Sequence, residues 1–163
     1  MTKRTDWNGA VTGRTEEDKV CDDLDNAGIK YKREHVAHSN ATAKRSHGEF
    51  DIDIMDQMFI EVKSVGKNSM SYSLDPNKKQ KGLVIKTHQL QSLYKKWFTE
   101  GKEAGLYFIF RPLKPIYVRI EDFYKYAIES TTKSITYYDS RIVGREVDGI
   151  MDIVNEVIKW KLY

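Results

Sequence analysis

The chain has 163 residues, is 40% hydrophobic and 31% charged, and carries a net charge of +3, which is the composition of one ordinary folded domain spanning residues 1–163. No apolar run approaches the ~18 residues of a membrane span, and the residues after Met1 lack the apolar segment of a secretory signal. The sequence therefore predicts an intracellular protein with no membrane partner. The single cysteine, Cys21, excludes an internal disulfide, and no zinc motif is present.

The first expected element is a helix that begins at Thr15, a hydroxyl cap followed by acidic residues, and stops at Gly28. Glu17 lies on its apolar face, where a carboxylate needs a partner. A metal ion beneath the helix would be one such partner. The alternative is that Glu17 needs no metal, because it lies in the first helical turn, where an acid is favourable and still reaches water. The apolar stripe consists of Val20, Cys21, Leu24 and Ala27.

A polar segment precedes the first strand of the central motif. It contains the basic pair Lys44-Arg45, which we interpret as part of a loop that contacts DNA. We interpret His35, His38 and His47 as surface or loop residues, because no cysteine or further histidine is suitably spaced to complete a metal site with them.

The most informative stretch, FDIDIMDQMFIEVKS at positions 50–64, predicts a hairpin of two strands, 50–54 and 58–63. Strict alternation places Asp51 and Asp53 on one face of the first strand, and Glu61 and Lys63 share one face of the second. Asp51 lies opposite Glu61 only if the loop comprises the three residues 55–57, because a two-residue loop would place them on opposite faces.

These residue types suit phosphodiester hydrolysis. Carboxylates and main-chain carbonyls bind hard cations such as Mg²⁺, so Asp51, Glu61 and the carbonyl of Val62 form a partial metal shell, with Asp53 as an additional candidate ligand. Lys63 would orient or deprotonate the attacking water, or offset charge on the transition state. The alternative is a solvated hairpin face, since the motif is short and its residues are common.

Residues 63–102 contain nine lysines against two acids, a local net charge of +7 that favours a phosphate backbone as partner. The alternative for any single lysine is a solvated surface. The flexible segment is expected at residues 65–80. The candidate DNA contacts are Lys67, Lys78, Lys79 and Lys81, with His88 and Gln89 at the start of the next helix as further candidates.

The remaining elements complete an α/β layout with a mixed central sheet flanked by helices. We expect a helix with the apolar residues Leu90, Leu93, Tyr94, Trp97 and Phe98, strands at 105–110 and 116–120, and a short helix from residue 121. Residues 130–145 are polar and tyrosine-rich, and 147–160 read as a final amphipathic helix. The helical part 127–163 has no catalytic signature and is a candidate for dimerisation or DNA docking.

The run Glu17-Asp18-Lys19-Val20, the helix ending at positions 27–31, Asp51 and Glu61-x-Lys63 together resemble the PD-(D/E)XK nucleases, which have a restriction-endonuclease-like core. Over residues 13–64 the spacing is most similar to Holliday junction resolvases of the phage endonuclease I type. The resemblance implies that Glu17, Asp51 and Glu61 bind divalent metal, Mg²⁺ or Mn²⁺, and that Lys63 is catalytic. Phe50 stands where the family usually has proline.

After Ser64 the chain looks more like archaeal-type and RecU-like resolvases, through Ser73-Leu74, the run 87–91 and the strand 105–111. In several families of this fold a glutamine approaches the site, and Gln89 or Gln91 is placed to do so. The resemblance implies a homodimer that cuts branched DNA during recombination, in the cytoplasm or nucleoid, with a phage or mobile element as a candidate source.

Two alternatives remain open at this point. One is a sequence-specific restriction or homing endonuclease of the same fold, with base-reading elements within residues 130–145, since fold alone does not choose between specificities. The other is a non-catalytic DNA-binding subunit with a vestigial site.

Overall fold

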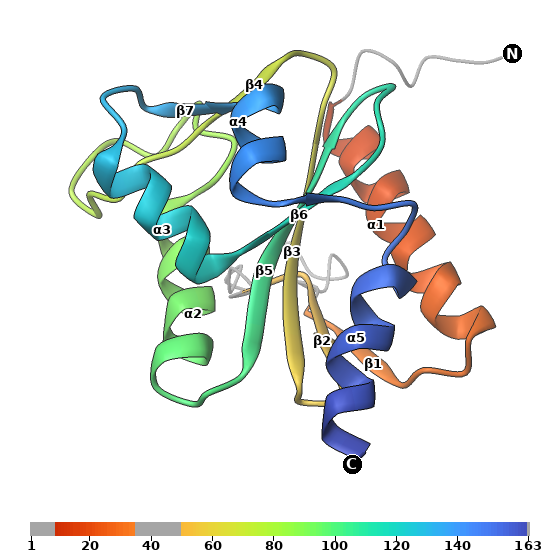
Figure 1. The fold of residues 1–163 in the computed structure, drawn as a ribbon. Coiled ribbons are helices and arrows are strands. Elements are labelled where there is room, and N and C mark those ends of the chain that lie inside the picture. The colour runs from red at the N-terminus through yellow and green to blue at the C-terminus, as the bar shows by residue number, and fades with distance from the viewer. Residues whose placement is uncertain (1–8, 35–49, 163) are drawn as a thin grey trace, which may run out of the picture.

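A six-stranded mixed sheet forms the centre of the computed structural model, which describes residues 9–34 and 50–162 (Figure 1). The strand order is β1-β2-β3-β5-β6-β8; β3 and β5 are parallel and the other neighbours antiparallel, while β4 and β7 form a separate antiparallel pair. The strands are β1 (Tyr31–Arg33), β2 (Ile52–Ile54), β3 (Met58–Val65), β4 (Ser69–Ser71), β5 (Glu103–Phe110), β6 (Ile116–Arg119), β7 (Ser134–Thr136) and β8 (Arg145–Glu146). The helices are α1 (Gly9–Asn26), α2 (Thr87–Phe98), α3 (Ile120–Glu129), α4 (Tyr137–Val143) and α5 (Met151–Leu162).

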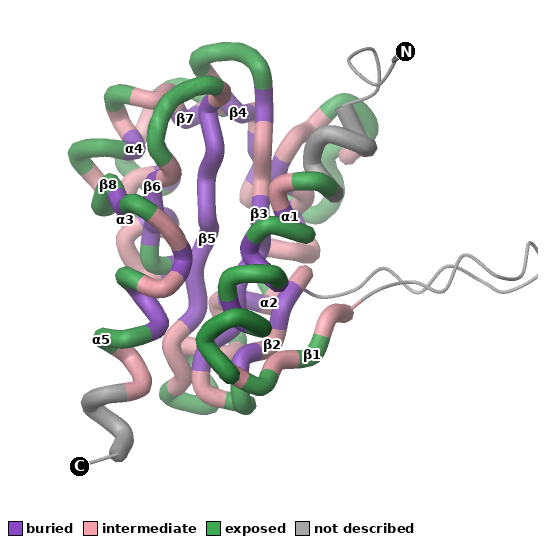
Figure 2. The backbone as a smooth tube through the Cα atoms, turned by 90° about the vertical axis from the view of Figure 1, so that its right-hand side faces the viewer, coloured by how far each residue is buried: buried purple, intermediate pink, exposed green. Residues whose placement is uncertain are grey.

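The sheet separates two hydrophobic cores. On one face, α1 and α5 cover a core that includes Ile52, Ile60 and Tyr107; on the other, α2 and α3 cover a core that includes Phe59 and Leu106 (Figure 1). The central strand β5 is buried along nearly its whole length, which explains its continuous apolar sequence (Figure 2). The expected α/β layout, a mixed central sheet flanked by helices, is confirmed.

Helix α1 begins six residues before the expected start at Thr15. Gly13 lies within the helix and does not end it, so Glu17 sits in the helix interior and not in the first turn. The explanation of Glu17 as a first-turn acid is therefore wrong.

The end of α1 follows the sequence closely. Gly28 has a φ of 70°, and the Ile29 and Gly28 amides donate to the carbonyls of Leu24 and Asp25, the hydrogen-bond pattern of a Schellman cap. Ala27 leaves the apolar stripe and is exposed because the chain turns away at this cap.

Several other boundaries differ from expectation. The segment 65–80 contains strand β4, which pairs with β7, and the polar stretch 130–145 contains β7 and α4. Phe98, expected in the apolar stripe of α2, is 69% exposed because it is the last residue of that helix. The final helix begins at Met151, four residues after its expected start.

Gly144 allows α4 to approach β6 closely. A Cβ atom at this position would overlap the main-chain carbonyl oxygen of Tyr117 and lie 2.7 Å from a methyl group of Val118. Because a backbone atom cannot move aside cheaply, Gly144→Ala is expected to lower the free energy of unfolding by about 1–3 kcal/mol. Urea unfolding measures this. Gly149→Ala is the control, since its Cβ would meet nothing closer than Asp23 at 3.7 Å; an equal loss in both variants would contradict the prediction.

Candidate active site

The β2–β3 hairpin has the register that the sequence predicts. Ile54 pairs with Met58, which leaves residues 55–57 as the loop, and the turn places Met55 and Asp56 in the left-handed region with φ of 55° each. The Asp51 amide donates to the carbonyl of Ile60 at 3.0 Å. The predicted three-residue loop is therefore confirmed, and Asp51 lies beside Glu61.

Asp51 is fixed by a main-chain contact. Its Oδ2 accepts a hydrogen bond from the Val62 amide at 2.8 Å. Because the N–H and C=O groups of one strand residue point to the same side, the Val62 carbonyl also faces the edge of β3 at which Asp51 lies. The carboxylate and the carbonyl expected to bind metal are thus on the same edge of β3.

Glu61 is the most buried charged residue of the site, with 1% of its surface exposed. Its Oε1 accepts hydrogen bonds from Lys63 Nζ at 3.0 Å and from Gln89 Nε2 at 2.7 Å. The other oxygen, Oε2, is buried and has no hydrogen-bond partner in the described part of the chain. One oxygen is therefore doubly held, and the other is available to a ligand.

Gln89 comes to the site from the first turn of α2. Its Oε1 accepts a hydrogen bond from the main-chain amide of Lys86, the residue that precedes the helix, at 3.0 Å. The same side chain therefore caps α2 and contacts Glu61. The structure places Gln89, a candidate DNA contact by sequence, against the carboxylate of Glu61.

Glu17 is 8% exposed, and its side chain has a cationic partner that the sequence did not identify. Arg33, on β1, donates to Glu17 Oε1 from Nε at 3.0 Å and from Nη2 at 2.8 Å, and its Nη1 lies 2.8 Å from Asp18. Because a buried acid needs a partner, a cationic residue beside Glu17 is expected. The sequence does not show which one, because sixteen residues separate Arg33 from Glu17.

The three carboxyl groups influence one another. Burial raises the pKa of Asp51 well above its ordinary value, and the negative charges of Glu61 and Glu17 raise it further, against the opposing effects of Lys63 and the Val62 amide. Burial likewise raises the pKa of Glu61, which Lys63 lowers and Glu17 raises. Such mutual repulsion is relieved by a proton or by a cation.

A divalent cation fits this arrangement only in part. The buried, unpartnered Oε2 of Glu61, the raised pKa of Asp51 and the adjacent Val62 carbonyl are what a hard cation would satisfy. Across residues 9–34 and 50–162, however, no three His, Cys, Asp or Glu side chains are close enough together to hold a metal ion. Glu17 is held by Arg33, so a shell of three carboxylates requires Glu17 to turn from Arg33 towards the other two.

Asp53 has a different contact. Its Oδ1 accepts a hydrogen bond from the Asp56 amide at 2.8 Å and so closes the hairpin turn. Although it shares the face of Asp51, it is engaged at the other end of β2, and we leave it out of the proposed ligand set.

The lysines of residues 63–102 do not form one continuous stripe. Lys67, Lys78, Lys79 and Lys81 are exposed on the loops that precede α2. Lys96 pairs with Glu100 and Lys102 with Asp56, at the far end of a helix that is about 18 Å long. The candidates Lys44 and Arg45 lie outside the described residues. Among the described residues, the lysines predicted to contact DNA thus lie on the loops that precede α2, and His88 at the start of α2 remains a further candidate.

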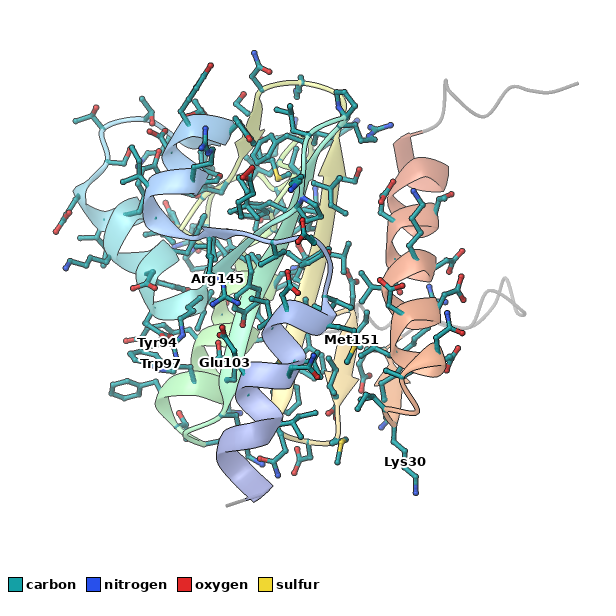
Figure 3. All side chains as sticks on the ribbon, turned by 45° about the vertical axis from the view of Figure 1, so that its right-hand side comes forward. Lys30, Tyr94, Trp97, Glu103, Arg145 and Met151 are labelled. Carbon is teal, nitrogen blue, oxygen red and sulfur yellow. The ribbon has the colours of Figure 1, made fainter. Side chains whose placement is uncertain are left out.

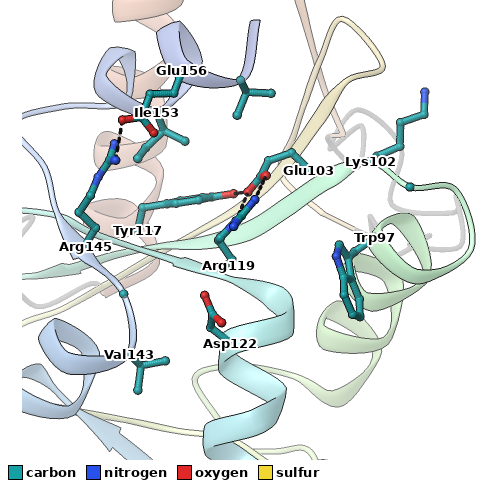
Figure 4. Close-up of a pocket in the computed structure, with 13 residues that line it drawn as sticks. Trp97, Lys102, Glu103, Tyr117, Arg119, Asp122, Val143, Arg145, Ile153 and Glu156 are labelled. Carbon is teal, nitrogen blue, oxygen red and sulfur yellow. Dashed lines mark hydrogen bonds and ion pairs between the residues drawn. The ribbon is translucent and has the colours of Figure 1, made fainter. Parts of the chain in front are cut away.

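A cavity of about 560 Å³ lies around Glu103 and is lined by residues of α2, α3 and α5, among them Trp97, Asp122 and Ile153 (Figure 4). Glu103, at the start of β5, accepts hydrogen bonds there from Tyr117 at 2.8 Å and from Arg119 at 3.1 Å. Figure 3 shows Glu103 and Arg145 towards α5, whereas Tyr94 and Trp97 lie on α2. Because Glu103 pairs with Met58 and Glu61 with Leu106, the side chains of Glu103 and Glu61 lie on opposite faces of the sheet.

The raised carboxyl pKa values predict a pH dependence of stability. Asp51 and Glu61 bind protons more tightly in the folded than in the unfolded chain. Their contribution to stability is therefore fully present below the ordinary carboxyl pKa of about 4 and is lost as pH rises through the raised values. In EDTA, Asp51→Asn is expected to raise Tm by several degrees at pH 8 and by much less at pH 4. Thermal unfolding followed by circular dichroism measures this, and an equal shift at both pH values would contradict it.

No helix within the described residues is long and apolar enough to cross a membrane.

No protein-family model matches the sequence, and no curated protein sequence matches it. Among solved structures, the fold is similar to that of Hjc, a Holliday junction resolvase from the archaeal hyperthermophile Archaeoglobus fulgidus. The TM-score is 0.53 and the sequence identity 16%, and the similarity covers 83% of this chain and 97% of that chain. At this identity the likeness establishes the fold: the mixed sheet with its flanking helices is the α/β architecture that Hjc also has.

Proposed function

We propose that this protein is a metal-dependent DNA endonuclease that resolves four-way junctions. The observation that carries the proposal is the pairing of half-buried Asp51 with buried Glu61, whose Oε2 has no hydrogen-bond partner among the described residues and whose Oε1 lies 3.0 Å from Lys63 Nζ. A purely structural Glu61–Lys63 ion pair would not need a second carboxyl group beside Glu61, because the repulsion between the two carboxylates destabilises the folded protein. The fold shared with Hjc supports the junction as substrate.

Each residue has a distinct proposed role. Asp51, Glu61 and the Val62 carbonyl would hold Mg²⁺ or Mn²⁺, with Glu17 as a further ligand once it leaves Arg33. When bound, the metal supplies Lewis-acid polarisation of the phosphate and a more acidic water. Lys63 holds its ammonium group beside Glu61, where it orients the attacking water and offsets negative charge in the transition state. Gln89 keeps Glu61 from rotating.

DNA is proposed to cross the loops that precede α2. Lys67, Lys78, Lys79 and Lys81 are exposed there, and each phosphate they neutralise adds about 0.9 to the slope of log K against log salt concentration. Lys44 and Arg45, which lie outside the described residues, stay candidate DNA contacts on the sequence alone.

We also propose an intracellular homodimer, because two sites related by a twofold axis can cut paired strands of one junction. The part 127–163 is the proposed pairing surface. Within it, Ile128, Tyr138 and Ile142 are each more than 70% exposed. Sedimentation at the concentrations used for cleavage tests this arrangement; a monomer there would contradict it.

The function is tested with a labelled synthetic four-way junction and its matched linear duplex, each incubated with Mg²⁺ and with EDTA. Paired nicks in the junction alone, lost in EDTA, are the expected result. Cutting of the linear duplex at one site would instead indicate a restriction or homing endonuclease. Binding without any hydrolysis would indicate a non-catalytic DNA-binding subunit.

A further inference from the structure

Lys86 is a second lysine beside the candidate active site, and the roles above leave it unused. It immediately precedes α2, and its main-chain amide donates to Gln89 Oε1 at 3.0 Å. Gln89 in turn donates to Glu61 Oε1 at 2.7 Å. A single side chain therefore links the backbone of Lys86 to the buried carboxylate, which fixes the position of Lys86 relative to the site.

The ammonium group of Lys86 has no carboxylate partner within the described residues. Its Nζ donates to one neutral acceptor, the main-chain carbonyl of Gln80, at 2.8 Å. Lys63, in contrast, is paired with Glu61. A half-buried ammonium group with a single neutral acceptor retains both its charge and unused donors.

Lys63 and Lys86 are close enough to affect each other. Partial burial and the positive charge of Lys63 both lower the pKa of Lys86. Two ammonium groups held near each other are destabilising unless an anion lies between them or beside both. The fold thus holds two ammonium groups within electrostatic range of each other, and of the two only Lys63 is paired with a carboxylate of the described residues.

The loop that carries the exposed lysines also ends at Lys86. Gln80 accepts from Lys86 Nζ through its main-chain carbonyl and from the Thr87 amide through its side chain at 2.9 Å. Lys79 and Lys81 flank Gln80 in the sequence and are exposed. A DNA strand that follows these lysines is therefore led to Lys86 and then to Glu61.

We propose that Lys86 binds a non-bridging oxygen of the scissile phosphodiester, as a second phosphate-binding lysine beside Lys63. This inference rests on the proposed function, because it requires that DNA is cut at Glu61. In it, Lys79 and Lys81 bind flanking phosphates, whereas Lys86 binds the phosphate that is cleaved. The distinction is one of position along the DNA and can be measured.

The test first maps the cleaved phosphodiester of a synthetic four-way junction with the wild-type protein. Binding is then measured by fluorescence anisotropy in an Asp51→Asn background, at one ionic strength, with the native junction and with a junction that has an uncharged methylphosphonate at the mapped position. Lys86→Met is expected to weaken binding of the native junction about 10-fold, the effect of losing one charge-assisted hydrogen bond, and to change binding of the methylphosphonate junction much less.

Two further variants make the outcome decisive. Lys81→Met is expected to weaken binding of both junctions by the same factor, because its phosphate is not the modified one. Lys86→Arg keeps the charge and is therefore expected to bind the native junction more tightly than the methylphosphonate junction, as the protein with Lys86 does. Thermal unfolding shows whether either Lys86 variant is misfolded. Equal effects of Lys86→Met on both junctions, or no effect on either, would overturn the inference alone. Absence of cleavage by the wild-type protein would overturn the proposed function and this inference together.

Discussion

Replacement of Asp51 by asparagine is expected to reduce the rate of metal-dependent junction cleavage by about 10³-fold, the equivalent of several kcal/mol of transition-state stabilisation. Asparagine keeps a side-chain oxygen that can accept the Val62 amide, so the hairpin is retained. What is lost is the negative charge that would hold the metal. Single-turnover cleavage of a labelled junction at saturating protein measures the rate, and junction binding is expected to stay within a few-fold of the wild-type value.

The matched control is Asp53→Asn, two residues away on the same face of the hairpin. Because Asp53 closes the turn through the Asp56 amide, and asparagine can accept the same hydrogen bond, this variant is expected to cleave at nearly the wild-type rate. Full activity of Asp51→Asn would refute the site. Equal loss in both variants would instead place Asp53 among the metal ligands.

The second large effect is expected for Lys63→Met, with a loss of cleavage rate of about 10²- to 10³-fold at saturating substrate. Methionine has a similar length without the charge, so the loss reports the ammonium group. Since Lys63 lowers the pKa of Glu61, its removal raises that pKa further, and metal affinity is expected to fall more at pH 6 than at pH 8. Mn²⁺ titration by calorimetry at the two pH values separates the effect on affinity from the effect on rate.

Lys95→Met is the control for this variant, because Lys95 lies in the same helix as Gln89 but is exposed near the C-terminal end of that helix. It is expected to leave the cleavage rate and the metal affinity unchanged. A Lys63→Met protein that cleaved at the wild-type rate with unchanged metal affinity would show that the Glu61–Lys63 pair is structural.

The structure also shows how one hairpin and helix α2 bring these side chains together. The hairpin brings Asp51 to Glu61 through the Val62 amide, and α2 contributes Gln89 to the same Glu61 oxygen that Lys63 contacts. Neither donor contacts the Oε2 atom of Glu61, which has no hydrogen-bond partner in the part of the chain that the structure describes. The site is thus arranged around one oxygen that is fixed and one that is available.

The sequence by itself determined the features that depend on near neighbours. Strand alternation and the loop at 55–57 set the hairpin register, since a one-residue slip would have reversed every side chain. Glycine at position 28 set the end of α1, and the helical period placed Glu17 on its buried face. The pattern of apolar residues predicted the four strands β2, β3, β5 and β6 of the central sheet, whereas the short edge strands β1 and β8 were not predicted.

Only the tertiary structure decided which distant residues meet. Arg33 reaches Glu17 across sixteen residues, and Gln89 reaches Glu61 across twenty-eight, distances over which periodicity gives no information. The lysines that seemed one basic stripe separate because α2 carries some of them away from the site. The predicted start of α1 was also wrong. Thr15 has the residue type of a helix cap, but the helix begins at Gly9 and includes Thr15. Local pattern determines which way a side chain faces, whereas its partners depend on how the elements pack.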